Sequence, residues 1–132
     1  MDRFFLDANV LFSAAWRGNS GLLRLWKLPG AELVSSAYAI DEARRNITDT
    51  GARARLEALL AETTIVAEGS LAALPPHPTL ASKDRPILAA AIRAGATHLV
   101  TGDRKDFGRL FGRRPGGVLV LRPADYLESR KP

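Results

Sequence analysis

The sequence predicts an α/β domain in which helices cover both faces of a mostly parallel, five-stranded sheet. Short apolar or β-branched runs alternate along the chain with longer segments whose apolar residues recur at helical spacing. Breaks containing glycine or proline separate many of these segments. Strands that alternate with helices pair in parallel and carry helices on both faces. At 132 residues, the chain has the size of one domain, so residues 1–132 are expected to share one core.

Five short segments favour strands because they are rich in apolar or β-branched residues. They span residues 4–6, 32–35, 63–67, 98–101 and 118–121. Helices are expected over residues 9–16, around residues 22–26, and from Asp84 to Gly95. Another is expected to run from a Ser36 cap to about residue 46. The helix after it is expected to begin at a cap, Asp49 or Thr50, and to carry an apolar stripe of Leu56, Leu59 and Leu60. The proline-rich stretch 69–81 is expected to be a loop with at most one short helical turn.

Composition limits the functions that the chain can have. A formal net charge of +5 and a pI of about 10.2 favour a polyanionic partner, although a basic surface that serves only solubility stays open. No apolar run approaches the roughly 20 residues that cross a bilayer, and the N-terminus does not resemble a signal peptide. A cytoplasmic location without membrane attachment is therefore expected. With 0 cysteines and 2 histidines, any metal is expected to be held by oxygen.

Acidic residues fall where a parallel sheet gathers its ligands. Asp7 ends the first strand, Asp103 follows the fourth, and Asp84 opens the helix that leads into the fourth. Ligands of such sheets bind beyond the carboxyl ends of the strands, at the topological switch point. Mg²⁺ and Mn²⁺ prefer oxygen ligands, and clustered carboxylates repel one another unless a cation is present. The acids therefore predict a divalent-cation site, with Glu42 from the helix ending near 46 as a further member.

Each acid also has a structural interpretation. Asp7 and Asp84 are suited to be helix N-caps, worth about 1 kcal/mol each. Asp103 follows Gly102, a pair that favours turns, and Glu42 lies in a helix where a solvated glutamate is ordinary. These alternatives stay open for each residue taken alone, whereas the set favours a metal site.

Four segments resemble, in order, the four motifs of the PIN-domain family. They are residues 5–11 (FLDANVL), 35–42 (SSAYAIDE), 83–91 (KDRPILAAA) and 99–107 (LVTGDRKDF). Each motif is short, but the four together extend over nearly the whole chain. The resemblance implies a three-layer α/β/α sandwich and a ribonuclease that depends on Mg²⁺ or Mn²⁺. It further implies the toxin half of a type II toxin–antitoxin pair, with RNA as substrate, a cognate antitoxin as partner, and the homodimer common in the family.

The resemblance also implies roles for individual residues. Carried over position by position, it assigns catalysis and metal binding to Asp7, Glu42, Asp84 and Asp103. Asp106 is an additional metal ligand or an alternative to Asp103. Asn9 and Thr101 take supporting positions, where amide and hydroxyl groups orient carboxylates or metal-bound water.

Basic residues flank the acids in sequence and suit a phosphate-binding channel, with a solvated basic face as the alternative. Those assigned to RNA binding are Arg44, Arg45, Arg104 and Lys105, and Arg109, Arg113 and Arg114 lie farther along. Trp16, Leu22 and Trp26 are expected in the core. If a partner protein binds, their two helices would offer an apolar groove for its amphipathic segment.

Two other functions were weighed against metal-dependent hydrolysis of RNA. A haloacid-dehalogenase-type phosphatase also places an aspartate after its first strand, but it needs a second aspartate two residues later, where this chain has Asn9. A catalytically silent PIN-like domain would bind RNA or protein only. The intact acids argue against it, because an RNA-binding surface gains nothing from clustered negative charge.

Overall fold

One parallel sheet organises the computed structural model, which describes residues 1–18, 20–74 and 80–130. The strands lie in the order β3-β2-β1-β4-β5, and every neighbouring pair is parallel. Their bounds are β1 (Asp2–Leu6), β2 (Ala31–Ser36), β3 (Thr64–Val66), β4 (His98–Val100) and β5 (Leu119–Leu121). The predicted five-stranded sheet is confirmed.

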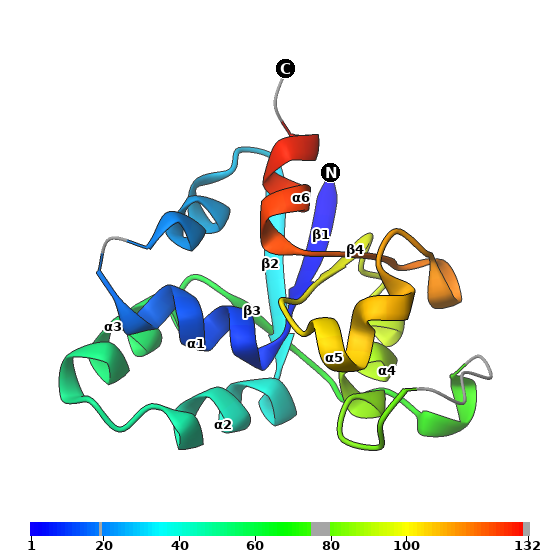
Figure 1. The fold of residues 1–132 in the computed structure, drawn as a ribbon, viewed down its shortest axis with the longest axis horizontal. Coiled ribbons are helices and arrows are strands. Elements are labelled where there is room, and N and C mark those ends of the chain that lie inside the picture. The colour runs from blue at the N-terminus through cyan, green and yellow to red at the C-terminus, as the bar shows by residue number, and fades with distance from the viewer. Residues whose placement is uncertain (19, 75–79, 131–132) are drawn as a thin grey trace.

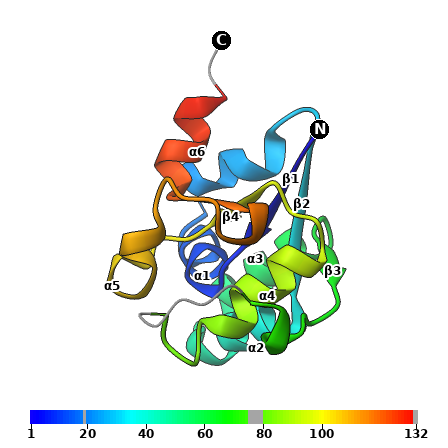
Figure 2. The same cartoon turned by 90° about the vertical axis from the view of Figure 1, so that its right-hand side faces the viewer.

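Helices cover both faces of this sheet and complete three layers (Figure 1). On one side lie α1 (Ala8–Trp16), α2 (Ala37–Asn46) and α3 (Thr50–Leu60), and on the other lie α4 (Arg85–Arg93) and α5 (Arg104–Phe107). In the view of Figure 2, α4 lies in front of the strands and α2 and α3 lie behind them. Successive strand residues face opposite sides. Phe4 and Leu6 accordingly pack with α1 to α3, whereas Phe5 packs with α4.

Capping side chains begin α2 and α3, two of the helices that the sequence predicted. The Ser36 hydroxyl accepts a hydrogen bond from the backbone N–H of Ala39 at 3.3 Å, at the start of α2. Asp49, rather than Thr50, caps α3 by accepting from the N–H of Ala52 at 2.8 Å. Both bonds satisfy backbone donors that have no partner within the helix.

Several short helices depart from the expected elements. The segment around residues 22–26 is a 3₁₀ helix, η1 (Gly21–Lys27), and further 3₁₀ turns are η2 (Leu71–Ala73), η3 (Gly108–Leu110) and η4 (Pro115–Gly117). Neither α5 nor the last helix, α6 (Pro123–Ser129), was predicted. Pro123 begins α6 at the position where proline is favoured. Of the predicted loop 69–81, residues 75–79 lie outside the described residues.

The expected core placement is wrong for Trp16, whose surface is 45% exposed. Leu22 and Trp26 are half-buried, and Leu25 is the fully buried residue of η1. The Trp26 ring N–H is shared between the carbonyl of Leu59 at 3.2 Å and the Thr63 hydroxyl at 3.1 Å. Nowhere in residues 1–18, 20–74 and 80–130 is a helix both long and apolar enough to span a bilayer.

The strand order creates a switch point beside β1. From β1 the chain builds outward through β2 and β3, then returns through α4 to place β4 on the other side of β1. Asp7 directly follows β1, and Thr101 directly follows β4. The Asp7 backbone N–H donates to the carbonyl of Val100 at 3.1 Å, which joins the two strand ends. The acids after these strands are thereby brought to one edge of the sheet.

Candidate metal-binding active site

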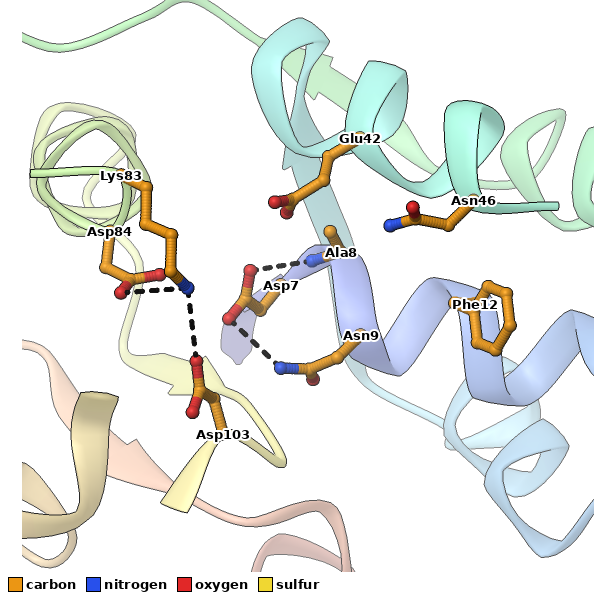
Figure 3. Close-up of a pocket in the computed structure, with 9 residues that line it drawn as sticks. All are labelled: Asp7, Ala8, Asn9, Phe12, Glu42, Asn46, Lys83, Asp84 and Asp103. Atoms are coloured by element: carbon orange, nitrogen blue, oxygen red, sulfur yellow. Dashed lines mark hydrogen bonds and ion pairs between the residues drawn. The ribbon is translucent and has the colours of Figure 1, made fainter. Parts of the chain in front are cut away.

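A pocket with a volume of about 310 Å³ opens at this edge of the sheet (Figure 3). Its lining combines acids with a cation, two amides and one aromatic ring: Asp7, Ala8, Asn9, Phe12, Glu42, Asn46, Lys83, Asp84 and Asp103. The four acids singled out from the sequence all belong to this lining. They come from the ends of β1 and β4, the middle of α2 and the start of α4.

Asp7 is the most firmly held of these acids and is only 3% exposed. Its Oδ1 accepts a hydrogen bond from the N–H of Ala8 at 2.7 Å, and its Oδ2 accepts one from the Thr101 hydroxyl at 2.8 Å. Burial raises the pKa of Asp7 to about 6, although both of these hydrogen bonds oppose the rise. The negative charges of Glu42 and Asp103 raise this pKa further. Capping of α1 and a place in the pocket are therefore compatible roles for Asp7.

Asn9 and Thr101 connect Asp7 to the loop after β4. The Asn9 amide donates to Asp7 Oδ2 at 3.5 Å and to the Thr101 hydroxyl at 3.3 Å. Its oxygen accepts from the N–H of Gly102 at 3.0 Å. The Thr101 hydroxyl also accepts from the N–H of Asp103 at 3.1 Å. These bonds set the position of Asp7 relative to Asp103.

A second group of acids meets around Lys83. Oxygen atoms of Asp84, Asp103 and Asp106 all lie within 4.8 Å of one another. The Lys83 ammonium lies 2.6 Å from Asp106 Oδ2, 3.4 Å from Asp84 Oδ2 and 3.8 Å from Asp103 Oδ2. The hydrogen bond to Asp106 and the three negative charges raise the pKa of Lys83 above its ordinary value. The ammonium thus occupies the position where a cation is attracted most strongly.

Asp84 is a buried acid that protein groups satisfy only in part. It is 5% exposed, its side chain does not cap α4, and its Oδ2 accepts no hydrogen bond from any residue that the structure describes. Asp84 therefore occupies the N-cap position of α4, but the expected capping hydrogen bond of its side chain is absent. Burial raises the pKa of Asp84 to about 7, with Lys83 opposing the rise and Asp106 adding to it. A buried carboxylate oxygen that accepts no hydrogen bond and has only the Lys83 ammonium, 3.4 Å away, as its cationic neighbour among the described residues fits a ligand of a divalent cation.

Asp103 and Asp106 lie at the start of α5. Asp103 caps this helix, accepting from the N–H of Asp106 at 3.0 Å, so a structural role and a place in the acidic group coincide. The pKa of Asp106 is held below its usual value, chiefly by Lys83. Asp106 belongs to the three-acid group but not to the lining of the pocket.

Glu42 approaches the pocket from α2, and Figure 3 shows its carboxylate pointing toward Asp7. Asn46, one turn later on the same helix face, also lines the pocket. Asn46, Phe12 and Lys83 were not predicted as site residues. Helical spacing from Glu42 pointed to Asn46, and spacing from Asn9 pointed to Phe12. The position of Lys83 next to Asp84 was the available signal for that residue.

The four basic residues assigned to RNA binding lie outside the described lining of the pocket. Arg44 is held by Glu57 through two hydrogen bonds of 3.0 and 2.8 Å, so its guanidinium is already paired. Arg45, Arg104 and Lys105 are exposed and form no ion pair with a carboxylate in the described part of the chain. The cation that does reach the pocket is Lys83.

Similar proteins share this architecture. A crystal structure of VapBC2 from Rickettsia felis bound to a promoter DNA fragment matches with a TM-score of 0.66 at 14% identity, covering 91% of this chain and 98% of that one. The Mycobacterium tuberculosis toxin VapC20, described as cleaving the sarcin-ricin loop, matches with a TM-score of 0.54 at 15% identity, covering 76% and 91%. At such identities these likenesses establish the fold alone. No curated protein sequence matches significantly. Residues 3–105 match the family model of the PIN domain, and the chain belongs to that family.

Proposed function

We propose that this protein is a metal-dependent endoribonuclease that hydrolyses RNA phosphodiester bonds, with residues 1–132 acting as one nuclease domain. The observation that carries the proposal is the convergence of Asp7, Glu42, Asp84 and Asp103 on one pocket. Two of these acids are buried, and burial raises the pKa of each. A site of this kind favours bound cations over an empty pocket.

The donor set suits Mg²⁺ or Mn²⁺. Asp7, Asp84 and Asp103 would be the principal ligands, with Glu42 and Asp106 as further ligands. The Oδ2 of Asp84, which is buried and accepts no hydrogen bond from the described residues, is the strongest single argument for the fit. A bound divalent cation would supply charge stabilisation at the scissile phosphate and a more acidic attacking water.

The chain's own residues would position the reacting groups. Thr101 and Asn9 hold the Asp7 carboxylate in one orientation. Glu42 has no hydrogen-bond partner among the described residues and is available to accept a hydrogen bond from the attacking water. Tyr38 donates its hydroxyl to the carbonyl of Lys83 at 2.8 Å and so fixes the lysine beside the acids. From there the ammonium can contact a phosphate oxygen, while Arg45, Arg104 and Lys105 would bind the backbone farther out.

We further infer that the protein is the toxin of a type II toxin–antitoxin pair that acts in the cytoplasm. The two similar structures named above carry the VapBC and VapC descriptions, and one of them is described as a toxin that cleaves the sarcin-ricin loop. The fold, the acids and the net positive charge of +5 agree with such a role. A cognate antitoxin would be the protein partner.

RNA cleavage tests the proposal directly. Wild-type protein incubated with total RNA and Mn²⁺ or Mg²⁺ is expected to produce cut fragments, and EDTA is expected to stop the reaction. Asp7→Asn and Glu42→Gln should each lose activity by two or more orders of magnitude. Asp41→Asn is the matched control, because Asp41 neighbours Glu42 on α2 but is exposed and lies outside the described lining of the pocket.

The alternatives give different outcomes. A catalytically silent RNA-binding domain would leave the RNA whole and bind it equally well in EDTA. The phosphatase has no support at position 9, which is Asn9, and both oxygens of Asp7 already accept hydrogen bonds. Equal cleavage by wild type and Asp7→Asn, or cleavage that is insensitive to EDTA, would refute the nuclease assignment.

A further inference from the structure

A groove continues from the acidic pocket along the outer face of α1. Two further cavities, of about 430 and 580 Å³, follow this face. The first shares Asn9 and Asp103 with the acidic pocket, the second shares Phe12 with it, and Ser13 lines both. We call these two neighbouring cavities the α1 groove. A ligand held in the acidic pocket therefore lies next to residues that also line the α1 groove.

Two aromatic rings stack within the α1 groove. Phe12 and Trp16 lie one turn apart on α1, with ring centroids 5.4 Å apart and ring planes only 17° from parallel. Leu11 and Ala15, on a neighbouring face of α1, are fully buried, and Phe12 is half-buried and packs against the same core. Trp16 is 45% exposed, whereas Trp26 is half-buried and its ring N–H is bonded. Folding therefore makes little use of the Trp16 ring.

Positive charge accompanies the ring pair. Arg17 lines the outer cavity and is exposed, and no carboxylate among the described residues pairs with it. Arg55 donates to the carbonyls of Ala15 at 2.8 Å and Trp16 at 2.9 Å, which holds a second guanidinium at the end of α1. The remaining lining is polar, from Ser13 and Ser20. Flat aromatic surface between cations and hydroxyls suits a nucleobase and its phosphates better than it suits an apolar protein segment.

We propose that Phe12 and Trp16 form a stacking platform for an unpaired nucleobase of the RNA whose phosphate enters the acidic pocket. At about 1.5 Å of helix rise per residue, the two rings lie about 7 and 13 Å along α1 from Asp7. At about 3.4 Å per stacked nucleotide, this is about two to four nucleotides from the cleaved bond. The platform rests on the proposed ribonuclease function and assigns to it a base-binding subsite outside the acidic pocket.

Tryptophan fluorescence gives a direct readout, because Trp16 and Trp26 are the only 2 tryptophans of the chain. The probes are a single-stranded mixed-sequence oligoribonucleotide and a strand of equal length and charge with abasic residues. Each strand is titrated into Asp7→Asn protein, so that the RNA stays uncut while the complex forms. The base-containing strand is expected to quench Trp16. The quench should persist in Trp26→Phe, disappear in Trp16→Phe, and be absent with the abasic strand.

Affinity for the same two strands tests the energetic role. Trp16→Ala is expected to bind the base-containing strand about 5- to 100-fold more weakly, with Trp16→Phe largely restoring binding. Ile65→Ala removes a comparably exposed side chain from β3 and should bind like the parent. Equal affinity of Trp16→Ala and its parent for the base-containing strand would overturn the platform and leave the ring as a contact for a protein partner.

The outcomes separate this inference from the ribonuclease proposal. If wild-type protein cleaves RNA and Trp16→Ala cleaves it with unchanged KM and kcat, the platform alone is refuted. If wild-type protein neither binds nor cleaves RNA in the presence of Mn²⁺, the ribonuclease proposal fails first. A raised KM for Trp16→Ala, with unchanged Mn²⁺ affinity, is the result expected.

Discussion

Replacing Asp7 with Asn should stabilise the metal-free protein at pH 8 while it abolishes activity. The ionised carboxylate is buried beside other acids, and the pKa of Asp7 is raised from its ordinary 3.8 to about 6. A group that is a stronger acid in the unfolded chain favours unfolding once it is ionised. Its protonated form therefore supports the fold at low pH, and this contribution is lost as the pH rises from about 4 to about 6.

The size of the effect follows from the same pKa values. At about 1.4 kcal/mol per pKa unit, a rise from 3.8 to about 6 corresponds to about 3 kcal/mol at pH 8. The amide cannot accept a hydrogen bond at both ends, so the bond from Thr101 is weakened at a cost of about 1 kcal/mol. We therefore expect Asp7→Asn to raise the free energy of unfolding by about 1 to 2 kcal/mol at pH 8 and to lower it slightly near pH 4.

Urea unfolding in EDTA, followed by tryptophan fluorescence at pH 4, 6 and 8, measures this difference. Carboxylates away from the pocket titrate alike in both proteins, so the difference between the two curves reports Asp7 together with its coupling to neighbouring acids such as Asp84. Asp41→Asn serves as the control, because it removes an exposed charge from α2. A variant-to-wild-type difference that stays constant from pH 4 to pH 8 would refute the idea that ionised Asp7 opposes folding.

Three further predictions follow from the same site and its surroundings. Lys83→Met should tighten Mn²⁺ binding several-fold in calorimetry, because the ammonium lies 2.6 Å from Asp106 and competes for the acids; weaker binding would contradict this competition. Thr101→Val removes the 2.8 Å hydrogen bond that lowers the pKa of Asp7. It should lower the free energy of unfolding by about 1 kcal/mol and shift the acid limb of the pH–rate profile to higher pH. Ser36→Ala should lower the free energy of unfolding, measured by thermal unfolding, by about 1 kcal/mol because the α2 cap is lost, and it should leave Mn²⁺ affinity unchanged. An altered Mn²⁺ affinity would show that the cap also positions Glu42.

Much of the fold follows from local sequence patterns. The β-branched run beginning at Thr63 and the apolar stripe ending at Leu60 each have the periodicity of one element type, and the structure has β3 and α3 there. The Ser36 cap follows from residue type, whereas residue type left both Asp49 and Thr50 open as the cap of α3, and the structure has Asp49 there. The four-residue α5 is too short to show a period, which explains why it was missed. The 3₁₀ geometry of η1 lies beyond what apolar spacing can distinguish from an α-helix.

The sequence by itself determined which acids stand at the carboxyl ends of β1 and β4, and therefore that they share an edge of the sheet. Only the tertiary structure decided how closely they approach and what lies among them. Lys83 reaches three acids, and Trp16 stays at the surface while Leu25 is buried. The reason is physical. Side-chain periodicity assigns a residue to a face, but burial and distances across more than ninety residues depend on how the layers pack, which no local pattern encodes.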